Sequence, residues 1–546
     1  MKAFLKNNQD KIRGVLAVVI AVTVAAVTLY NFGIRYQTND DATLSNIAAG
    51  AYGDSVHMVY VNVLFSLLLR PLYALWDVNW YVVIQLALVV VSIAVIAYLA
   101  MKKLGIFGGG CTVLAVLAAF AHHIFYSFQY TECSFIILTA GLLLVAENLG
   151  RFNRGTVLGI VLSLFGAMIR WSGFYAVGAM SAAILLYRFF RLDKRGKRMA
   201  VITMAVLFGV TFGAKLVDMG AYAVHDGWKE YTAYNAARTR YSDFKSLQLG
   251  QENPFEQYGI TDVDYVMLSN WDFYDEERFD TPLIEQLAEG KQDISFEQLC
   301  RATGEKLKAM TQGDSSGYLL LAVCILSLAA IRPQWAVTSL AGVFATFGLL
   351  VMYLLYEIRF PSWVETGLIW TLAVFAVFCI GEIKPNRVIF ALCSVVLLVY
   401  TLGASVTFYR ELQLQSPAYK EWTKLEQGYF EQMSADKDNI YLLSTAAINV
   451  AAGFDVEKPR EEDFYSNIVA YGGWLSRAPH RNAALASYGL KRPLVDAVDN
   501  PRVFLDYHNI DAVERYVEQE LGIDVQVIKT GGNDFAPYQL VTTVER

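Results

Sequence analysis

The stretch Thr38-Asn39-Asp40-Asp41 places two adjacent carboxylates directly after the first long apolar run of the chain, residues 14–32. The run is long enough to cross a bilayer, so the two acids mark the point where a first helix leaves the membrane. Carboxylates beside an apolar phase are expensive and are usually kept for a function. We therefore expect the rest of the chain to build a membrane-embedded cavity around Asp40 and Asp41.

The composition is that of a polytopic helical membrane protein. Of the 546 residues, 55% are hydrophobic and 18% are charged, and the mean hydropathy is +0.36. In soluble domains, about one quarter of the residues are charged. The formal charge of −6 comes without a basic block, which excludes a typical nucleic-acid binder. The six cysteines form no CxxC pair, so neither a disulfide framework nor a zinc site is predicted.

Apolar runs predict about eleven membrane spans. They cover approximately residues 14–32, 81–101, 108–125, 131–147, 155–169, 173–187, 199–219, 318–331, 336–356, 363–380 and 388–408. Cytoplasmic loops are enriched in Lys and Arg. The basic residues before the first span and the six in the loop 188–198 therefore place the N-terminus in the cytoplasm and the C-terminus outside.

This orientation predicts a transmembrane domain over residues 1–408 with two large external loops. The loop 34–80 contains an apolar piece, 58–76, that is interrupted by polar residues. We predict a helix lying in the plane of the outer leaflet, because a crossing here would invert the polarity of every later loop. The second external loop covers residues 221–315.

Residues 409–546 are predicted to form an extracytoplasmic soluble α/β domain. An amphipathic helix over 410–433 leads to strands near 439–443, 502–505, 523–528 and 538–543 and a helix over 511–521, capped by Asp511 and followed by Gly522. The domain has no glycine-rich phosphate loop. Substrate docking, capping of the cavity and contact with the envelope are the roles left open for it.

Asp40 and Asp41 are the candidate catalytic residues. A general base needs a carboxylate that meets the acceptor hydroxyl and is shielded from bulk water, and the end of an outward helix provides that position. The alternative is that Asp40 only caps a helix beginning near Ala42. We favour a catalytic role, with a slight preference for Asp41. Asp54 and His57 follow in the same loop and are candidates for the cavity lining, with a solvated loop as the alternative.

Three arginines lie at the predicted outer face, where the orientation rule disfavours basic residues: Arg70, Arg170 and Arg359. A guanidinium offers forked donors that suit a phosphate group. Lipid headgroups are the alternative partners, since arginines commonly extend along apolar surface to the interface. Arg359 is the first candidate for binding a lipid phosphate, because it lies in a rigid polar interruption between two spans.

The loop 221–315 is rich in aromatic and amide side chains, among them Tyr234, Asn235, Arg238 and Trp271. A sugar ring offers an apolar face and a rim of hydroxyls, which such groups recognise. These four residues are therefore candidates for binding a sugar or acceptor. An aromatic belt at the membrane interface explains part of the same pattern.

Three segments carry a resemblance to a known class: TNDDATLSNIAAGAYGD (38–54), YNAARTRYSDF (234–244) and EIRFPSWVE (357–365). Together with the layout of spans and loops, they resemble the GT-C superfamily of glycosyltransferases and a broad, largely uncharacterised group of bacterial multispan membrane proteins. The resemblance implies a bacterial plasma membrane, a polyprenyl-phosphate-linked sugar as donor and an inverting transfer. It also implies that an acidic residue of the first external loop, here Asp40 or Asp41, acts as base or metal ligand.

These observations predict an inverting glycosyltransferase that modifies a cell-envelope polymer or lipid at the outer membrane face. A second acidic motif found in some GT-C enzymes is not evident, so a divalent cation bound by Asp40 and Asp41 is left open. Two other functions remain. A transporter or flippase of lipid-linked sugars would use similar polar groups, and a non-catalytic envelope assembly protein would use the two acids as helix caps alone.

Overall fold

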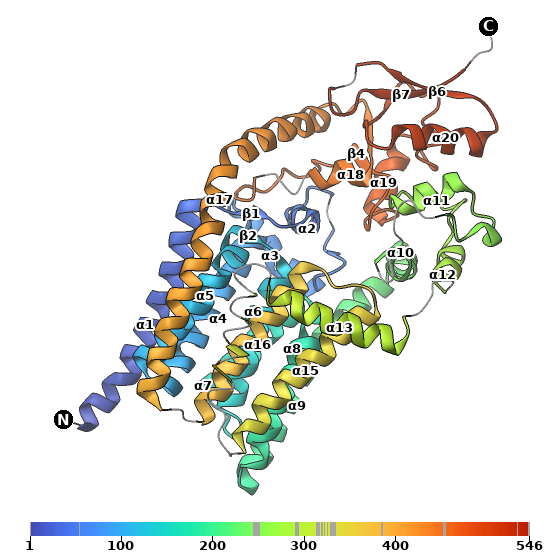
Figure 1. Ribbon diagram of the computed structural model, residues 1–546. Helices are drawn as coiled ribbons and strands as arrows, with labels where there is room; N and C mark the ends of the chain where they lie inside the picture. Colours follow the sequence, from blue (N-terminus) through green and yellow to red (C-terminus); the bar gives the residue numbers. More distant parts are fainter. Residues whose placement is uncertain are drawn as a thin grey trace.

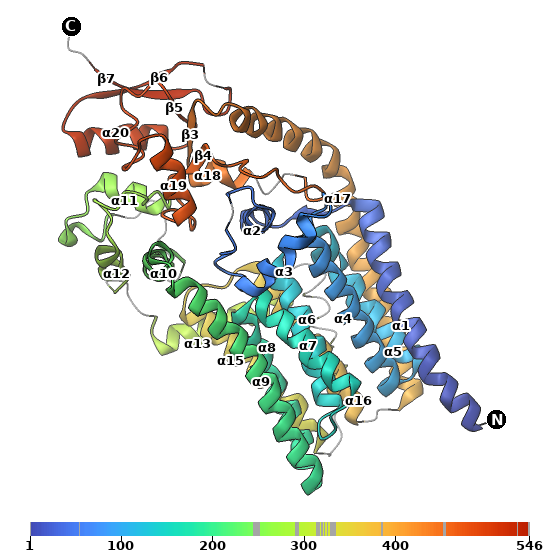
Figure 2. The ribbon, with the colours of Figure 1, turned by 180° about the vertical axis from the view of Figure 1, so that it is seen from behind.

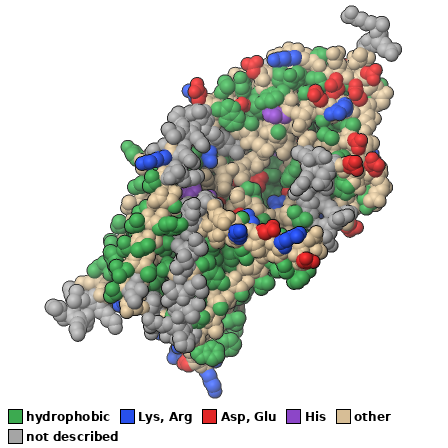
Figure 3. All heavy atoms as spheres, in the orientation of Figure 1, with side chains coloured by type: hydrophobic (Ala, Val, Ile, Leu, Met, Phe, Trp, Pro, Cys, Tyr) green, Lys and Arg blue, Asp and Glu red, His purple; other side chains and the backbone are tan. Residues whose placement is uncertain are grey.

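The computed structural model of the chain has a bundle of long helices and a smaller polar layer at one end of it (Figure 1). It describes residues 2–53, 55–243, 252–289, 294–312, 317, 320, 323–324, 326–327, 335–383, 386–450, 455–531 and 533–543. Hydrophobic side chains cover much of the bundle surface, whereas acidic side chains gather mainly over the polar layer (Figure 3). This distribution is the one expected of a membrane protein with a water-exposed end.

The bundle is built around two helices that are apolar on every side. They are α6 (Tyr130–Glu147) and α16 (Ser362–Ile383). In each of them, 94% of the residues in the most apolar 18-residue stretch are buried. The surrounding helices are α1 (Lys2–Phe32), α4 (Trp80–Leu104), α5 (Ile106–Ala121), α7 (Arg154–Ile169), α8 (Trp171–Phe190), α9 (Lys194–Ala223), α15 (Ala336–Tyr356) and α17 (Arg387–Ala435). A helix without a polar face belongs in the middle of such a bundle.

Glycine allows the central helix α6 to approach α7 closely. A Cβ atom added at Gly141 would come within 2.8 Å of the carbonyl oxygen of Gly159 on α7. Small residues at such crossings are typical of membrane helices, because backbones in close contact gain the packing that lipid does not provide. A larger side chain at Gly141 would separate the two helices.

Eight helices among the described residues are long and apolar enough to cross a membrane. Two shorter apolar helices, α7 and the part 390–406 of α17, coincide with two further predicted spans. Most of the remaining predicted span, 318–331, lies outside the described residues. The structure therefore supports a multi-pass membrane protein, and the number eleven stays a prediction.

The first loop contains two short helices, α2 (Asn39–Ala49) and α3 (Val63–Tyr73). The eleven residues of α3 rise about 16 Å, roughly half the hydrocarbon thickness of a bilayer. A helix of this length does not cross a membrane by itself, and the in-plane position of α3 stays a prediction. The short strand β1 (Arg35–Tyr36) pairs with β2 (Ser127–Phe128) in parallel and holds the start of the loop against the beginning of α6.

The alternative to catalysis, that Asp40 only caps a helix beginning near Ala42, does not agree with the structure. Helix α2 begins at Asn39, and Thr38 is its N-cap residue with an extended backbone. Asp40 already lies in the first helical turn, where its side chain leaves the helix rather than capping it. The C-terminal helix was likewise predicted to be capped by Asp511, whereas Asn509 occupies the N-cap position and Asp511 lies in the first turn.

The C-terminal part forms a five-stranded sheet of order β4-β3-β5-β7-β6. Its strands are β3 (Ile440–Leu443), β4 (Ile468–Ala470), β5 (Val503–Leu505), β6 (Val525–Lys529) and β7 (Tyr538–Thr542), with helices α18 (Thr445–Ile448), α19 (Pro479–Ser487) and α20 (Ile510–Leu521). Strands β4, β3 and β5 are parallel, and β7 and β6 continue the sheet antiparallel. Strand β4 was not predicted, because its three buried residues have no alternation to reveal them.

Most of the large loop packs against this sheet domain and forms one layer with it, whereas α13 lies against α15 of the bundle (Figure 2). The loop contains α10 (Asp226–Arg238), α11 (Asp262–Ser269), α12 (Thr281–Glu289) and α13 (Phe296–Met310). The buried guanidinium of Arg477 donates to backbone carbonyls of the segment 273–279, and Arg492 forms an ion pair with Asp275 at 2.6 Å. We call α10–α12 together with residues 440–542 the cap layer.

Candidate functional site

A cavity of about 430 Å³ lies between the bundle and the cap layer. Its lining combines residues from the first loop, the ends of three membrane helices, the large loop and the C-terminal sheet. These residues are Asn39, Asp40, Thr43, Tyr60, Tyr130, Arg170, Arg238, Asp243, Ser269, Asn270, Trp271, Arg359, Trp363, Thr445, Ala446, Ile448, Asn449, Ala470, Gly472, Gly473, Trp474, Leu475, Arg481 and Asn509. The volume lies within the range of about 300–1,000 Å³ that is usual for small-molecule sites.

Asp40 lies in this cavity and faces a group of cations. The Trp474 side chain is hydrogen-bonded to its carboxylate, and Arg170, Arg238 and Arg359 stabilise the negative charge. Burial nevertheless raises the pKa of Asp40, because the loss of water outweighs these favourable interactions. A carboxylate with a raised pKa is a stronger proton acceptor than an ordinary aspartate.

Asp41 does not line this cavity and is used within the fold. Its side chain is fully buried. One oxygen accepts from the backbone N–H of Tyr130 at 2.9 Å, and the other accepts from the Thr38 hydroxyl at 2.7 Å. Burial raises the pKa of Asp41 to about 8, which favours the neutral form at pH 7. Successive residues on a helix are turned by about 100°, so the two acids serve different surroundings.

Arg170 and Arg359 contribute two guanidinium groups from the ends of membrane helices. Arg170 is the N-cap residue of α8, and its Nη1 donates to the Tyr130 hydroxyl at 2.9 Å. Arg359 lies between α15 and α16, where its Nη1 pairs with Asp243 at 2.7 Å. Burial lowers the pKa of Arg359, with Arg170 and Arg238 adding to the effect. Both arginines line the same cavity as Asp40, and their role in binding a lipid phosphate stays a prediction.

Arg238 is completely buried and is held by several partners. Its Nε donates to the Asn235 amide oxygen at 3.0 Å, and its Nη2 donates to the Tyr60 hydroxyl at 3.2 Å. Its guanidinium lies 5.4 Å from the ring centre of Trp271, a cation–π distance. Asn235 thus supports Arg238 instead of lining the cavity.

Strained backbone occurs at four positions around the cavity. Val59 (φ 63°) precedes Tyr60, Ile358 (φ 51°) precedes Arg359, and Trp271 (φ 68°) and Asn509 (φ 55°) belong to the lining. The left-handed region is unfavourable for side chains branched at Cβ, and such strain concentrates at functional sites. The Val59 N–H donates to the Tyr222 hydroxyl at 2.7 Å, which holds this conformation.

Several predicted site residues lie elsewhere. Arg70 lines a separate pocket of about 520 Å³ between α3 and the segment 459–462. His57 is buried and stacks on Trp228 at 4.5 Å. The Tyr234 hydroxyl bonds to Ser476 at 2.8 Å, so this tyrosine joins the two parts of the cap layer. Asp54 lies outside the described residues.

Other residues of the cavity were not foreseen. Asp243, the last residue of the short helix Thr239–Asp243, pairs with Arg359; it lies in the segment 234–244 but was not singled out as a site residue. Trp474, Thr445 and Asn509 come from the C-terminal domain, more than 400 residues along the chain from Asp40. Only the order of strands in the sheet brings them to the cavity, and that order is not visible in the sequence.

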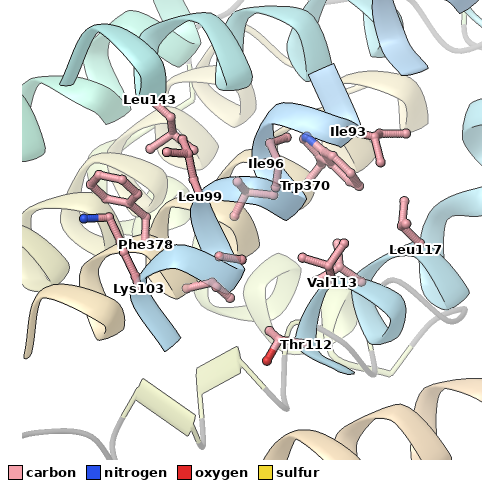
Figure 4. Close-up of a pocket in the computed structure, with 14 residues that line it drawn as sticks. Ile93, Ile96, Leu99, Lys103, Thr112, Val113, Leu117, Leu143, Trp370 and Phe378 are labelled. Carbon is pink, nitrogen blue, oxygen red and sulfur yellow. The ribbon is translucent and has the colours of Figure 1, made fainter. Parts of the chain in front are cut away.

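A small pocket inside the bundle is not a second site. It lies among α4, α5, α6 and α16, has about 20 Å³ and is lined by apolar side chains such as Leu99, Trp370 and Phe378 (Figure 4). This space holds about one water molecule. In the part of the chain that the structure describes, no group of three His, Cys, Asp or Glu residues is arranged to hold a metal ion.

Comparison with known proteins gives structural neighbours only. No protein-family model and no curated protein matches the chain. The crystal structure of ArnT from Cupriavidus metallidurans bound to undecaprenyl phosphate is similar at 12% identity, and its apo state at 11%. Each match covers 96% of this chain and 97% of ArnT, with a TM-score of 0.40.

At a TM-score of 0.40 and this identity, the likeness carries no argument about this chain. The function proposed below therefore rests on the side chains of the cavity.

Proposed function

We propose that this protein is an inverting glycosyltransferase that uses a polyprenyl-phosphate-linked sugar at the outer face of a bacterial plasma membrane. The observation that carries the proposal is the cavity that Asp40 shares with Arg170 and Arg359. It contains a candidate base with a raised pKa and an excess of guanidinium groups beside the ends of membrane helices. This is the combination that transfer from a lipid phosphate requires.

In the proposed reaction, Asp40 accepts the proton of the acceptor hydroxyl while the hydroxyl oxygen attacks C1 of the sugar. The bond between C1 and the phosphate oxygen breaks, and its electron pair leaves with the lipid phosphate. A single displacement of this kind inverts the configuration at C1. Positioned general bases contribute roughly 10²–10⁴ to such rates.

The leaving phosphate gains negative charge as the sugar departs. Arg170 and Arg359 are placed to stabilise that charge, and both project from the ends of membrane helices, close to where a lipid headgroup would lie. Preorganised cations in a site shielded from water act strongly on developing charge. Arg238, which is saturated by protein partners, holds Tyr60 and Trp271 in place.

Asp41 has a structural role in this proposal. It connects the first turn of α2 to the first turn of α6, and this connection fixes the direction in which Asp40 leaves the helix. The slight preference for Asp41 that the sequence suggested is therefore replaced by Asp40. A divalent cation is not required by the proposed step.

The test is transfer by the purified full-length protein in proteoliposomes, with radiolabelled polyprenyl-phosphate hexose as donor and an envelope lipid fraction as acceptor. We expect Asp40→Asn to lower kcat by about 10²–10⁴ while donor binding stays within twofold. Wild-type transfer rates in the Asp40→Asn variant would contradict the proposal. Donor that crosses the bilayer without product formation would favour a flippase.

A further inference from the structure

The C-terminal sheet has a reversal of strand order directly above the cavity. Strand β3 is followed in the chain by β4 on one side of it and then by β5 on the other. In open parallel sheets, ligands bind in the crevice outside the carboxyl ends of the strands where the order reverses. The carboxyl ends of β3, β4 and β5 therefore define a crevice that is expected to bind a ligand.

This crevice opens into the cavity that contains Asp40. Thr445 follows β3, Gly472 follows β4 and Asn509 lies four residues beyond the end of β5, and all three line the cavity. Gly472 is necessary here, because a Cβ atom at this position would overlap the Thr445 hydroxyl and the Trp271 carbonyl. The cavity is thus one continuous space. Its membrane side lies at the ends of the membrane helices, and its sheet side lies at the crevice of the C-terminal sheet.

The two sides differ in chemistry. The membrane side carries Asp40 and the guanidinium groups of Arg170 and Arg359. The sheet side and its neighbouring loop carry neutral hydrogen-bonding groups, those of Ser269, Asn270, Asn449 and Asn509. Among the described residues, no hydrogen-bond partner is found for the Ser269 hydroxyl, although it is buried.

The ionisable groups near the crevice are engaged within the protein. Arg481 is buried, donates to the carbonyl oxygen of Ile468 at 2.6 Å and lies 4.4 Å from the ring centre of Tyr52. Asp272 is buried behind Thr445, whose hydroxyl is 3.4 Å from it, and burial raises the pKa of Asp272 well above its ordinary value. The crevice therefore presents amides, hydroxyls and the Trp271 ring without a charge that is ready to bind.

We infer that the crevice at the ends of β3, β4 and β5 binds the sugar of the donor, and that this sugar is uncharged. The inference rests on the proposed function, since it places the lipid phosphate on the membrane side. Amide and hydroxyl groups exchange hydrogen bonds with sugar hydroxyls, and an indole face covers the apolar face of the ring. A uronic acid or an amino sugar would bring a charge without an opposite partner, which is costly in such a site.

The experiment measures binding to the full-length protein in detergent by tryptophan fluorescence, because Trp271, Trp363 and Trp474 line the cavity. The probes are inorganic phosphate, glucose 1-phosphate and glucuronic acid 1-phosphate. We expect glucose 1-phosphate to bind about tenfold tighter than phosphate, and glucuronic acid 1-phosphate to show no such gain.

The variants are Asn449→Ala and Asn509→Gly, and glycine retains the left-handed backbone at position 509. Each is expected to weaken glucose 1-phosphate binding about three- to tenfold, the usual effect of one or two neutral hydrogen bonds. Neither should change phosphate binding. Gln526→Ala, on the far edge strand β6, is the matched control and should change neither.

Three results would overturn the inference: equal affinity for glucose 1-phosphate and phosphate, equal affinity for the glucose and glucuronic acid compounds, or equal weakening of all probes by the variants. None of them requires turnover. If the protein bound these probes without discriminating between them but still catalysed transfer, this inference alone would be rejected. Transfer by the Asp40→Asn variant would reject the proposed function alone.

Discussion

The same three helices connect two clusters of charge that behave differently. Helices α6, α8 and α16 begin at the cavity, where they provide Tyr130 and Trp363 and carry Arg170 at the N-cap of α8. At their other ends they carry Glu147, Arg188 and Glu382. The distal cluster, completed by Lys102 and Lys103 of α4, is held by direct ion pairs, whereas Asp40 in the cavity interacts with its arginines across an open space.

In the distal cluster every carboxylate meets a cation at contact distance. Glu147 pairs with Lys102, Lys103 and Arg188 at 3.0, 2.9 and 2.7 Å, and Glu382 pairs with Arg188 at 2.6 Å and with Lys103. The cavity, in contrast, is lined by four arginines and only two aspartates. The comparison teaches that direct ion pairs mark charges used within the fold, and that a carboxylate facing arginines across an open space is a candidate for meeting a ligand.

Among substitutions that test this comparison, the largest effect is expected from removing a cavity cation. Arg359→Gln should lower kcat about 10²–10³-fold, because one preorganised donor to the developing phosphate charge is lost. Arg359→Lys should recover only part of the rate, since lysine lacks the forked geometry. The transfer assay measures both, and thermal unfolding of the same samples serves as control. An Arg359→Gln enzyme with normal kcat would remove this arginine from the site.

The next effect concerns pH. Burial raises the pKa of Asp40, and the proposed base acts only when it is ionised. The value of kcat/KM should therefore fall about tenfold per pH unit below a pKa that lies above the ordinary value of about 3.9 for aspartate. A profile of kcat/KM against pH for the wild-type protein measures this pKa. The same profile for the Arg359→Lys variant is the comparison. An acid limb at or below pH 3.9 would contradict the burial of Asp40.

The distal cluster should respond in the opposite way. Removing one partner of a buried ion pair lowers the free energy of unfolding by about 3–5 kcal/mol. In Arg188→Gln, Lys103 still contacts both glutamates. We therefore expect a smaller loss of about 2 kcal/mol. The loss should appear as a lower Tm with kcat within twofold. Arg191→Gln is the control, because Arg191 is exposed one turn further on and lies over the Tyr187 ring. A large loss of kcat in Arg188→Gln without a change in Tm would erase the distinction between the clusters.

The smallest effect tests backbone strain. Ile358→Gly should relieve about 1–3 kcal/mol of left-handed strain, since glycine tolerates the φ of 51°. Stability should be retained or increased, while a looser Arg359 should lower kcat several-fold. Gly348→Ala on α15, where an added Cβ meets nothing, is a control for a general change in this helix. Unchanged kcat would show that Ile358 does not position Arg359.

Much of the bundle could be predicted, because a membrane reduces the problem to apolar length and charge asymmetry. The same reasoning placed Asp40, Arg170 and Arg359 on one side. It could not choose between Asp40 and Asp41, because that choice depends on a contact with Tyr130, whose position is set by the β1–β2 pair. It also placed Arg70 with the other arginines, since topology gives a side of the membrane and not a place within it.

The cap layer shows the opposite limit. The strands β3, β5, β6 and β7 lie near their predicted positions. The three residues of β4 are too few to show an alternation of apolar and polar residues. Without β4 the strand order is unknown, and so is the crevice that brings Thr445 and Asn509 to the cavity. Tyr234 and Asn235 were predicted to bind a sugar or acceptor, yet in the structure Tyr234 is hydrogen-bonded to Ser476 and Asn235 accepts from Arg238.

The most direct test of the central claim compares Asp40→Asn with Asp41→Asn in one transfer assay. The two substitutions are chemically identical and one residue apart, and only the first changes a carboxylate of the cavity. We predict that Asp40→Asn loses transfer and keeps donor binding, whereas Asp41→Asn keeps kcat within about fivefold. A loss of transfer in Asp41→Asn with a correctly folded protein, together with an active Asp40→Asn enzyme, would contradict the account.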